Sequence, residues 1–185
     1  MSSNYYKLRK DLYLEVSGVT LFRIEATKTI KKLEVKKGDI GGYVEKESNL
    51  SGDAWVCGNA RVYGDAQVYG NARVYGNARV YGDARVCGNA RVYGDARVCG
   101  NARVYGDAQV YGDKVKACSD CINLINTKYN VTILPGHLKI GCQYHSKNEW
   151  WNFTDREILQ MDGKDGLKWW KEWKPILAAI CETNR

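Results

Sequence analysis

Residues 52–111 consist of ten consecutive hexads, which read GDAWVC, GNARVY, GDAQVY, GNARVY, GNARVY, GDARVC, GNARVY, GDARVC, GNARVY and GDAQVY. Because the period of six is even, the alternation of side chains along a strand carries through every unit. We expect the alanine and the valine to point inward, and the Arg or Gln between them and the Tyr or Cys after the valine to point outward. Glycine followed by Asp or Asn supplies a turn. Each hexad therefore predicts a short strand and a corner.

The hexads resemble the repeats of hexapeptide-repeat proteins with the left-handed parallel β-helix fold. In that fold three hexads form one triangular coil, so the resemblance implies that residues about 18 apart stack at the ~4.8 Å spacing of neighbouring strands. Residues 40–111 would then supply four coils. The likeness includes bacterial and bacteriophage proteins that carry GNARVYGDARV arrays between a short β-rich N-terminal segment and a tryptophan-rich C-terminal one.

The repeat divides the 185 residues into three parts. We expect residues 1–39 to form a β-rich N-terminal cap, residues 40–117 to form the left-handed β-helix, and residues 118–185 to form a small α/β C-terminal cap. Caps are expected because both ends of a β-helix are open sheet edges that can pair with other chains.

Strand and helix signals can be assigned within both caps. In the N-terminal cap, residues 12–16, 19–26 and 31–39 read as strands, the first two joined by a turn at Ser17-Gly18. The C-terminal cap is expected to hold a strand pair and two or three short helices.

The strand pair of the C-terminal cap is predicted within residues 129–143, with its turn at Pro135. Residues 154–157 read as a capping box that begins a short helix, and Gly163 is expected to end that helix. A second helix follows, which Pro175 is expected to kink or restart because proline lacks the backbone donor.

Composition excludes several classes of protein. Charged residues make up 26% of the chain and hydrophobic ones 44%, which is typical of a globular protein. No run approaches the ~20 apolar residues that span a membrane, and the N-terminus lacks the apolar region of a secretory signal. The seven cysteines then indicate a reducing, cytoplasmic environment, which is the host cytoplasm if the protein is phage-encoded. A net charge of +7 is compatible with an acidic partner.

Two knuckle-like pairs, Cys-x-x-Cys and Cys-x-x-His about twenty residues apart, match the ligand number and spacing of a structural zinc site. Against zinc, the cysteines inside the hexads show that this chain uses thiols without metal. We expect no cofactor and read these residues as inert thiols and a structural histidine, with structural zinc as the alternative. The four residues are Cys118, Cys121, Cys142 and His145.

Stacking the hexads predicts three outer faces, each with a column of Arg or Gln beside a column of Tyr or Cys. The first face carries Trp55, Arg73, Arg91 and Gln109 beside Cys57, Tyr75, Tyr93 and Tyr111. The second carries Tyr43, Arg61, Arg79 and Arg97 beside Glu45, Tyr63, Tyr81 and Cys99. The third carries Asn49, Gln67, Arg85 and Arg103 beside Ser51, Tyr69, Cys87 and Tyr105.

Guanidinium planes beside aromatic rings can bind phosphates and stack bases. The alternative is a solvated face whose near-identical units define no single pocket. The candidate binding residues on these faces are Arg61, Arg73, Arg79, Arg91, Arg97, Tyr75, Tyr93 and Trp55, the last of which interrupts its column and could mark a contact.

Five tryptophans gather in residues 150–173. Their structural interpretation is an aromatic core that holds the cap helices against the last coil. Their functional interpretation is a contact patch, because tryptophan is enriched at binding hot spots. Trp150 and Trp170 are the candidate contacts, and Trp170 is expected to be exposed because it lies off the helical stripe.

The resemblance implies acyl transfer as the activity most often found on this fold, with a histidine base on the β-helix. Residues 40–117 contain no histidine, and the two in the chain are His137 and His145. We therefore predict a rigid, non-enzymatic binding or scaffold module that engages a host protein or an anionic ligand and self-associates, as a trimer by analogy with the fold. The first alternative is nucleotide or nucleic-acid binding on the Arg/Tyr faces, including sequestration of a nucleotide signal, and the second is acyl transfer.

Overall fold

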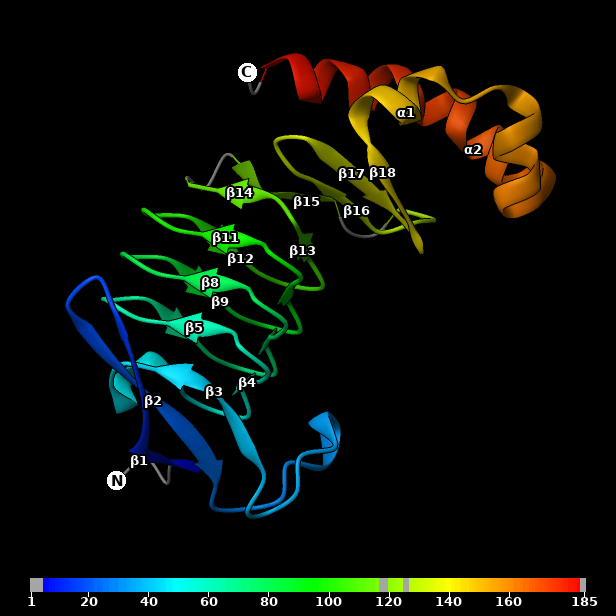
Figure 1. Ribbon diagram of the computed structural model, residues 1–185. Helices are drawn as coiled ribbons and strands as arrows, with labels where there is room; N and C mark the ends of the chain where they lie inside the picture. The colour runs from blue at the N-terminus through cyan, green and yellow to red at the C-terminus, as the bar shows by residue number, and fades with distance from the viewer. Residues whose placement is uncertain (1–4, 117–119, 125–126, 184–185) are drawn as a thin grey trace.

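In the computed structural model, which describes residues 5–116, 120–124 and 127–183, the chain winds into a β-solenoid of about four turns (Figure 1). A hairpin lies at the N-terminal end of the solenoid, and a small sheet with two helices lies across the other end. The prediction of a mainly β fold with a cap at each end is confirmed.

The solenoid has three faces of stacked parallel strands. The first face stacks β4 (Trp55–Val56), β7 (Arg73–Val74), β10 (Arg91–Tyr93) and β13 (Gln109–Tyr111). The second stacks β3 (Ile40–Val44), β5 (Arg61–Val62), β8 (Arg79–Val80), β11 (Arg97–Val98) and β14 (Lys114–Val115). The third stacks β6 (Gln67–Val68), β9 (Arg85–Val86) and β12 (Arg103–Val104). The pairing register, for example Arg73 with Arg91, Arg79 with Arg97 and Arg85 with Arg103, confirms the three predicted columns. The expectation that Asn49 lies on the outer side of the third face is wrong, because its side chain is buried.

Small side chains fill the solenoid. Every alanine and valine of the hexads from Ala60 to Val110 is 0% exposed, as the alternation predicted. At the corners, amide side chains donate along the stack from Asn71 to Asn89 (3.2 Å) and from Asn89 to Asp107 (3.0 Å). A carboxylate can only accept, so it suits the last position of such a ladder.

The N-terminal cap continues the second face. Strands β1 (Tyr6–Val16) and β2 (Val19–Ala26) form the predicted hairpin, and β2 pairs antiparallel with β3. The prediction of a third strand over residues 31–39 is wrong, because the chain forms the 3-10 helix η1 (Lys31–Leu33) there and keeps only an isolated bridge between Ile30 and Val35.

Residues 40–51, which precede the ten hexads, lead into the solenoid through β3 and the 3-10 helix η2 (Glu47–Asn49). Asn49 is 0% exposed, and its Nδ2 donates to the carbonyl oxygens of Ala66 (2.8 Å) and Gly64 (3.1 Å). A buried amide therefore satisfies backbone acceptors of the next coil where the hexad pattern begins.

The C-terminal cap contains a four-stranded antiparallel sheet rather than the expected strand pair. Its strands are β15 (Ile122–Leu124), β16 (Val131–Ile133), β17 (His137–Ile140) and β18 (Gln143–Ser146). The predicted turn at Pro135 joins β16 to β17. The short outer strands carry too weak an alternation to be seen in the sequence.

Two helices follow, α1 (Lys147–Asn152) and α2 (Asp155–Thr183). The predicted capping box is present, since the side chain of Glu157 accepts from the Thr154 backbone N–H at 2.8 Å. The predicted break occurs at Gly163, whose φ of +67° interrupts α2. The prediction that Pro175 kinks or restarts the helix is wrong. The backbone leaves helical geometry at Asp162 and Gly163 instead, and the helix continues through Pro175. None of the described helices has the length and apolarity that a membrane span needs.

The last coil is one residue shorter than the other coils. Lys114 of β14 pairs with Arg97, and the Arg97 backbone N–H donates to the carbonyl oxygen of Asp113 at 2.9 Å. In the other coils an alanine carbonyl accepts this bond. Asp113 therefore occupies an inward alanine position, and its side chain is buried beneath the cap.

Candidate functional site

Asp113 joins the solenoid to the C-terminal sheet. Its Oδ1 lies 3.0 Å from Nδ1 of His137 and 3.3 Å from the backbone N of Gly136, and its Oδ2 accepts from the Tyr144 hydroxyl at 2.5 Å. The His137 and Tyr144 rings stack with centroids 5.0 Å apart. Burial, and then the hydrogen bond to Asp113, raises the pKa of Tyr144 above its usual value. The carboxylate therefore fixes the cap on the last coil through one buried polar cluster.

Replacing Asp113 by alanine is expected to lower the free energy of unfolding by about 1–3 kcal/mol, because the partners of the buried carboxylate lose their acceptor. Asp113→Asn is the matched control, since its amide oxygen still accepts from Gly136 and its cost should stay within about 1 kcal/mol. Urea unfolding of both variants checks this. An alanine variant no less stable than the asparagine variant would mean that the cluster does not hold the cap.

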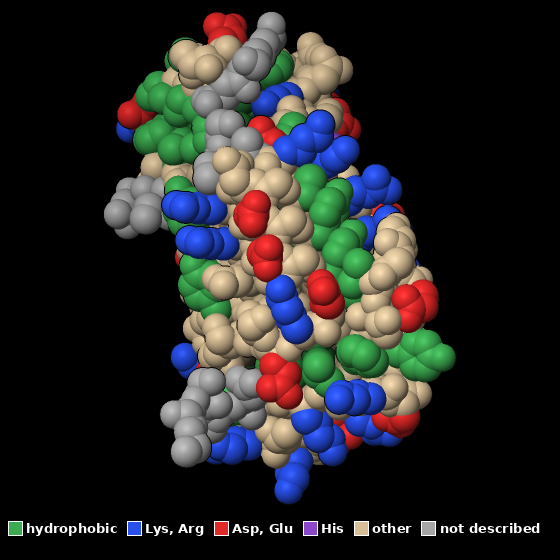
Figure 2. All heavy atoms as spheres, turned by 90° about the vertical axis from the view of Figure 1, so that its left-hand side faces the viewer, with side chains coloured by type: hydrophobic (Ala, Val, Ile, Leu, Met, Phe, Trp, Pro, Cys, Tyr) green, Lys and Arg blue, Asp and Glu red, His purple; other side chains and the backbone are tan. Residues whose placement is uncertain are grey.

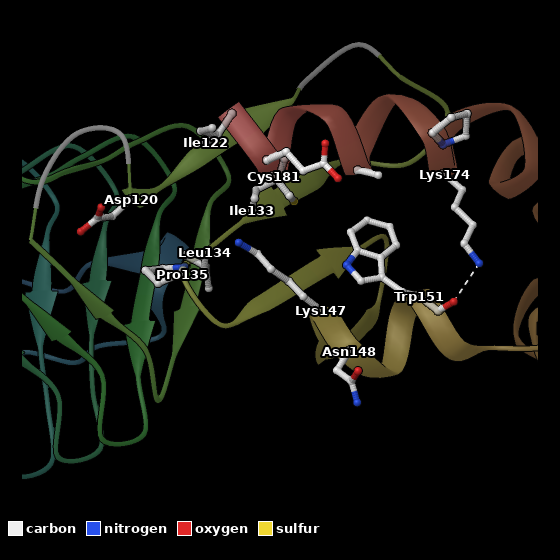
Figure 3. Close-up of a pocket in the computed structure, with 13 residues that line it drawn as sticks. Asp120, Ile122, Ile133, Leu134, Pro135, Lys147, Asn148, Trp151, Lys174 and Cys181 are labelled. Carbon is white, nitrogen blue, oxygen red and sulfur yellow. Dashed lines mark hydrogen bonds between the residues drawn. The ribbon is translucent and has the colours of Figure 1, made fainter. Parts of the chain in front are cut away.

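A pocket of about 830 Å³ lies within the C-terminal cap, between its sheet and both helices (Figure 3). Its floor is apolar and its walls carry charged side chains from α1 and α2. The lining residues are Asp120, Ile122, Ile133, Leu134, Pro135, Lys147, Asn148, Trp151, Lys174, Pro175, Ala178, Cys181 and Glu182.

The two lysines of this pocket have different surroundings. Lys174 Nζ donates to the Trp151 carbonyl oxygen at 2.9 Å and lies 5.5 Å from the centroid of the Trp170 ring. Lys147 and the Trp151 ring point into the pocket from α1 (Figure 3). Lys147 makes no ion pair within the part of the chain that the structure describes, so its ammonium is available to a ligand.

The structure buries both tryptophans that the sequence suggested as contacts. Trp150 is 3% exposed and Trp170 is 4% exposed, so the expectation that Trp170 is exposed is wrong. Trp170 lies off the stripe of Trp169 and Leu177, but α1 covers it, and it packs on Trp150 with centroids 5.1 Å apart. The structural interpretation, an aromatic core, is confirmed, but this core packs the helices against the C-terminal sheet and not against the last coil as expected. Trp151, which is partly exposed, lines the pocket instead.

The candidate zinc ligands lie in different surroundings. Cys118 falls outside the described residues. Cys121 is 3% exposed within the solenoid core, and burial raises the pKa of its thiol to about 12, whereas Cys142 is exposed. His145 packs edge-on against Trp150 in the cap core. Across residues 5–116, 120–124 and 127–183, no three or more His, Cys, Asp or Glu side chains group as metal ligands would. The zinc site stays a prediction.

The repeat arginines point outward as predicted, and within the described residues none of them forms an ion pair. The tyrosine columns stack: Tyr75 lies 4.9 Å from Tyr93, with their planes 4° apart. Trp55, expected as a possible contact, is only 5% exposed and belongs to the core. Arg73 is engaged by the N-terminal cap, since its Nη2 donates to the carbonyl oxygen of Lys32 at 3.0 Å. Figure 2 shows acidic and basic side chains interspersed on one side of the solenoid rather than one basic surface.

The residues that join the cap to the solenoid and line the pocket were missed by the sequence analysis. The sequence did mark the position of Asp113, because the hexad at residues 112–117 lacks the alanine that the ten hexads before it carry at their third position. Tyr144 and Lys147 had no such mark, because no periodicity links the cap to the coils, and Trp151 was seen only as a member of the tryptophan cluster.

The fold and these sites define a capped β-solenoid protein with an amphipathic pocket at its C-terminal end. A family model described as the YdcK beta solenoid repeat matches residues 54–70, 66–82, 72–85, 84–98 and 96–112. The matches support membership of the repeat in the β-solenoid class and do not extend to either cap. No curated protein sequence matches the chain.

Proposed function

We propose that this protein is a rigid, non-enzymatic binding module that holds a segment of a partner protein in the pocket that the sheet and the two helices of the C-terminal cap enclose. The observation that carries the proposal is that Lys147, which makes no ion pair with a described residue, and the Trp151 ring line one pocket together with apolar side chains such as Leu134. The partner segment would present apolar side chains to the floor and a carboxylate to Lys147.

The pocket suits binding because its walls are fixed to the solenoid. Leu134 in its floor is 1% exposed and packs into the solenoid core. The backbone N–H of Lys147 donates to the carbonyl oxygen of Gly136 at 3.0 Å, and the backbone N–H of Gly136 in turn donates to Asp113. A preformed site loses little conformational entropy when it binds.

The size and chemistry of the pocket agree with a short peptide. Ligand pockets commonly measure about 300–1,000 Å³ and combine apolar walls with a few polar groups. The wall also carries Glu182 and Asp120, and the ammonium of Lys174 already donates to the Trp151 carbonyl oxygen, so Lys147 is the favoured place for a single carboxylate of the segment.

Neither His137 nor His145 is among the residues that line this pocket. The Nδ1 of His137 faces Asp113, and the ring of His145 packs in the cap core. Acyl transfer therefore stays the less favoured alternative.

Selection from a displayed library of random peptides tests the proposal. We expect the full-length protein to enrich peptides with adjacent apolar residues and an acidic residue, and Lys147→Glu to weaken their binding at least about tenfold, equivalent to about 1.4 kcal/mol. Trp151→Ala should weaken them similarly. Lys168→Glu, at an exposed position of α2 that makes no ion pair with a described residue, is the matched control and should leave binding unchanged. Peptides that bind the wild type and both pocket variants equally, or no enrichment at all, would refute the proposal.

Self-association as a trimer and an origin in a bacteriophage also stay proposals, which follow from the resemblance of the repeat. A cytoplasmic location stays a proposal that follows from the cysteine content.

A further inference from the structure

Cys87 interrupts the tyrosine column of the third face. On the other two faces neighbouring tyrosines stack directly, with ring centroids 4.9 Å apart for Tyr75 and Tyr93 and 5.2 Å apart for Tyr63 and Tyr81. On the third face, the strands that precede Tyr69 and Tyr105 lie one on either side of the strand that precedes Cys87. Their positions are therefore separated by two strand spacings, about 9.6 Å.

The missing ring leaves a hollow of about 530 Å³ lined by Tyr69, Arg85, Cys87, Arg103 and Tyr105. Tyr105 is 50% exposed, as expected for a ring without a neighbour in the column. The interaction with the Cys87 thiol is the main cause that raises the pKa of Tyr69 above its usual value. Cys87 is the one repeat cysteine with a tyrosine on each side in its column, which makes this hollow distinct among otherwise similar units.

Two arginines flank the hollow. Arg85 and Arg103 pair directly across β9 and β12, and both are exposed. Neither makes an ion pair with any described residue. Two parallel guanidinium groups on adjacent strands repel each other, and an anion between them relieves that repulsion and accepts charge-assisted hydrogen bonds.

We propose that this hollow is a second binding site, separate from the peptide pocket, for one planar aromatic anion with the chemistry of a mononucleotide. The base inserts between Tyr69 and Tyr105 and completes the column at the position that a tyrosine ring occupies in most hexads. The phosphate lies over Arg85 and Arg103. Stacking on an aromatic ring tolerates any base, so the site selects for a ring joined to an anion rather than for one base.

The corresponding hollow on the first face is less suitable. It is lined by Arg73 and Arg91, but Arg73 already donates to Lys32, and the Asp107 carboxylate lies on its wall. The tyrosine column beside it is continuous from Tyr75 onward.

Calorimetric titration with adenosine 5′-monophosphate, adenosine and inorganic phosphate tests the proposal on the full-length protein. We expect the mononucleotide to bind and each fragment to bind at least about tenfold more weakly, because each uses only half of the site. Cys87→Tyr restores the commoner residue of the hexad and closes the gap, so it should leave thermal stability unchanged or higher and abolish mononucleotide binding.

Charge variants distinguish binding by Arg85 and Arg103 from a general attraction between the anion and the basic protein. Arg85→Gln introduces the residue that two hexads carry at this position, so folding should be retained while binding weakens at least about tenfold. Arg79→Gln removes the same charge from the second face and should leave binding unchanged.

Three results would overturn the proposal: mononucleotide affinity unaffected by Cys87→Tyr, phosphate binding as tightly as the mononucleotide, or no binding of adenosine 5′-monophosphate at about 1 mM. None of these bears on the peptide pocket, so the two proposals fail independently.

Discussion

Replacing Gly88 by alanine is expected to lower the free energy of unfolding by about 2–5 kcal/mol. Gly88 has a φ of +71°, a left-handed conformation that costs an L-residue about 1–2 kcal/mol. An added Cβ would also lie 2.9 Å from the backbone N and 3.1 Å from the backbone O of Gly106 in the next coil. Backbone in a ladder cannot move aside as a flexible side chain can, so overpacking adds about 1–3 kcal/mol.

Gly112→Ala is the matched control for this prediction. Gly112 has a φ of +70°, and nothing lies within 4 Å of its added Cβ, so it carries the conformational cost without the crowding. Denaturant unfolding of both variants should show Gly88→Ala to be the less stable by about 1–3 kcal/mol. Equal losses would mean that the stacked corners tolerate a methyl group and that coil spacing does not require glycine.

Trp150→Ala is expected to destabilise the C-terminal cap by about 3–5 kcal/mol, the usual cost of deleting a buried tryptophan. Trp150 packs against Trp170 and Phe153, with centroids 5.1 and 5.5 Å away, and its Nε1 donates to the carbonyl oxygen of Leu138 at 2.8 Å. Its removal leaves a cavity between α1, α2 and the sheet and takes away a buried donor.

The effect should be confined to the cap, because the cap core and the solenoid core are separate hydrophobic clusters. The helical circular dichroism signal should be lost at lower denaturant than the β signal of the solenoid. Trp151→Ala, at a partly exposed position, is the control and should cost clearly less. Loss of both signals in one unchanged transition, or equal effects of the two substitutions, would contradict the assignment of Trp150 to the cap core.

The short period made the solenoid predictable. Each hexad residue meets equivalent residues about 18 positions away, so the alternation of Ala and Val with Arg and Tyr is enough to place the column of Arg61, Arg79 and Arg97 on one face. The hairpin turn at Ser17-Gly18, the turn at Pro135 and the break at Gly163 were also predictable, because backbone conformation at these positions depends on local residue type.

The cap packing could not be read in the same way. Trp170 lies off the stripe of its own helix, and only α1, which folds back onto α2, covers it. A helical pattern reports which side of a helix meets the main core, and it does not report a second helix that packs on another side. The same reason kept Lys147 and Trp151 from being recognised as lining one pocket.

From the repeat alone follow the β-solenoid, its inward valines and alanines, its outward arginine and tyrosine columns, and the gap that Cys87 leaves in one of them. These follow because stacked parallel strands bring equal positions together at a constant spacing. The burial of Asp113 against His137 and Tyr144, the burial of Trp150 and Trp170, and the pocket at Lys147 depend on how the cap folds onto the last coil. Those contacts join segments of unrelated sequence, so no period or local preference encodes them, and they form only when hydrophobic burial brings the two cores together.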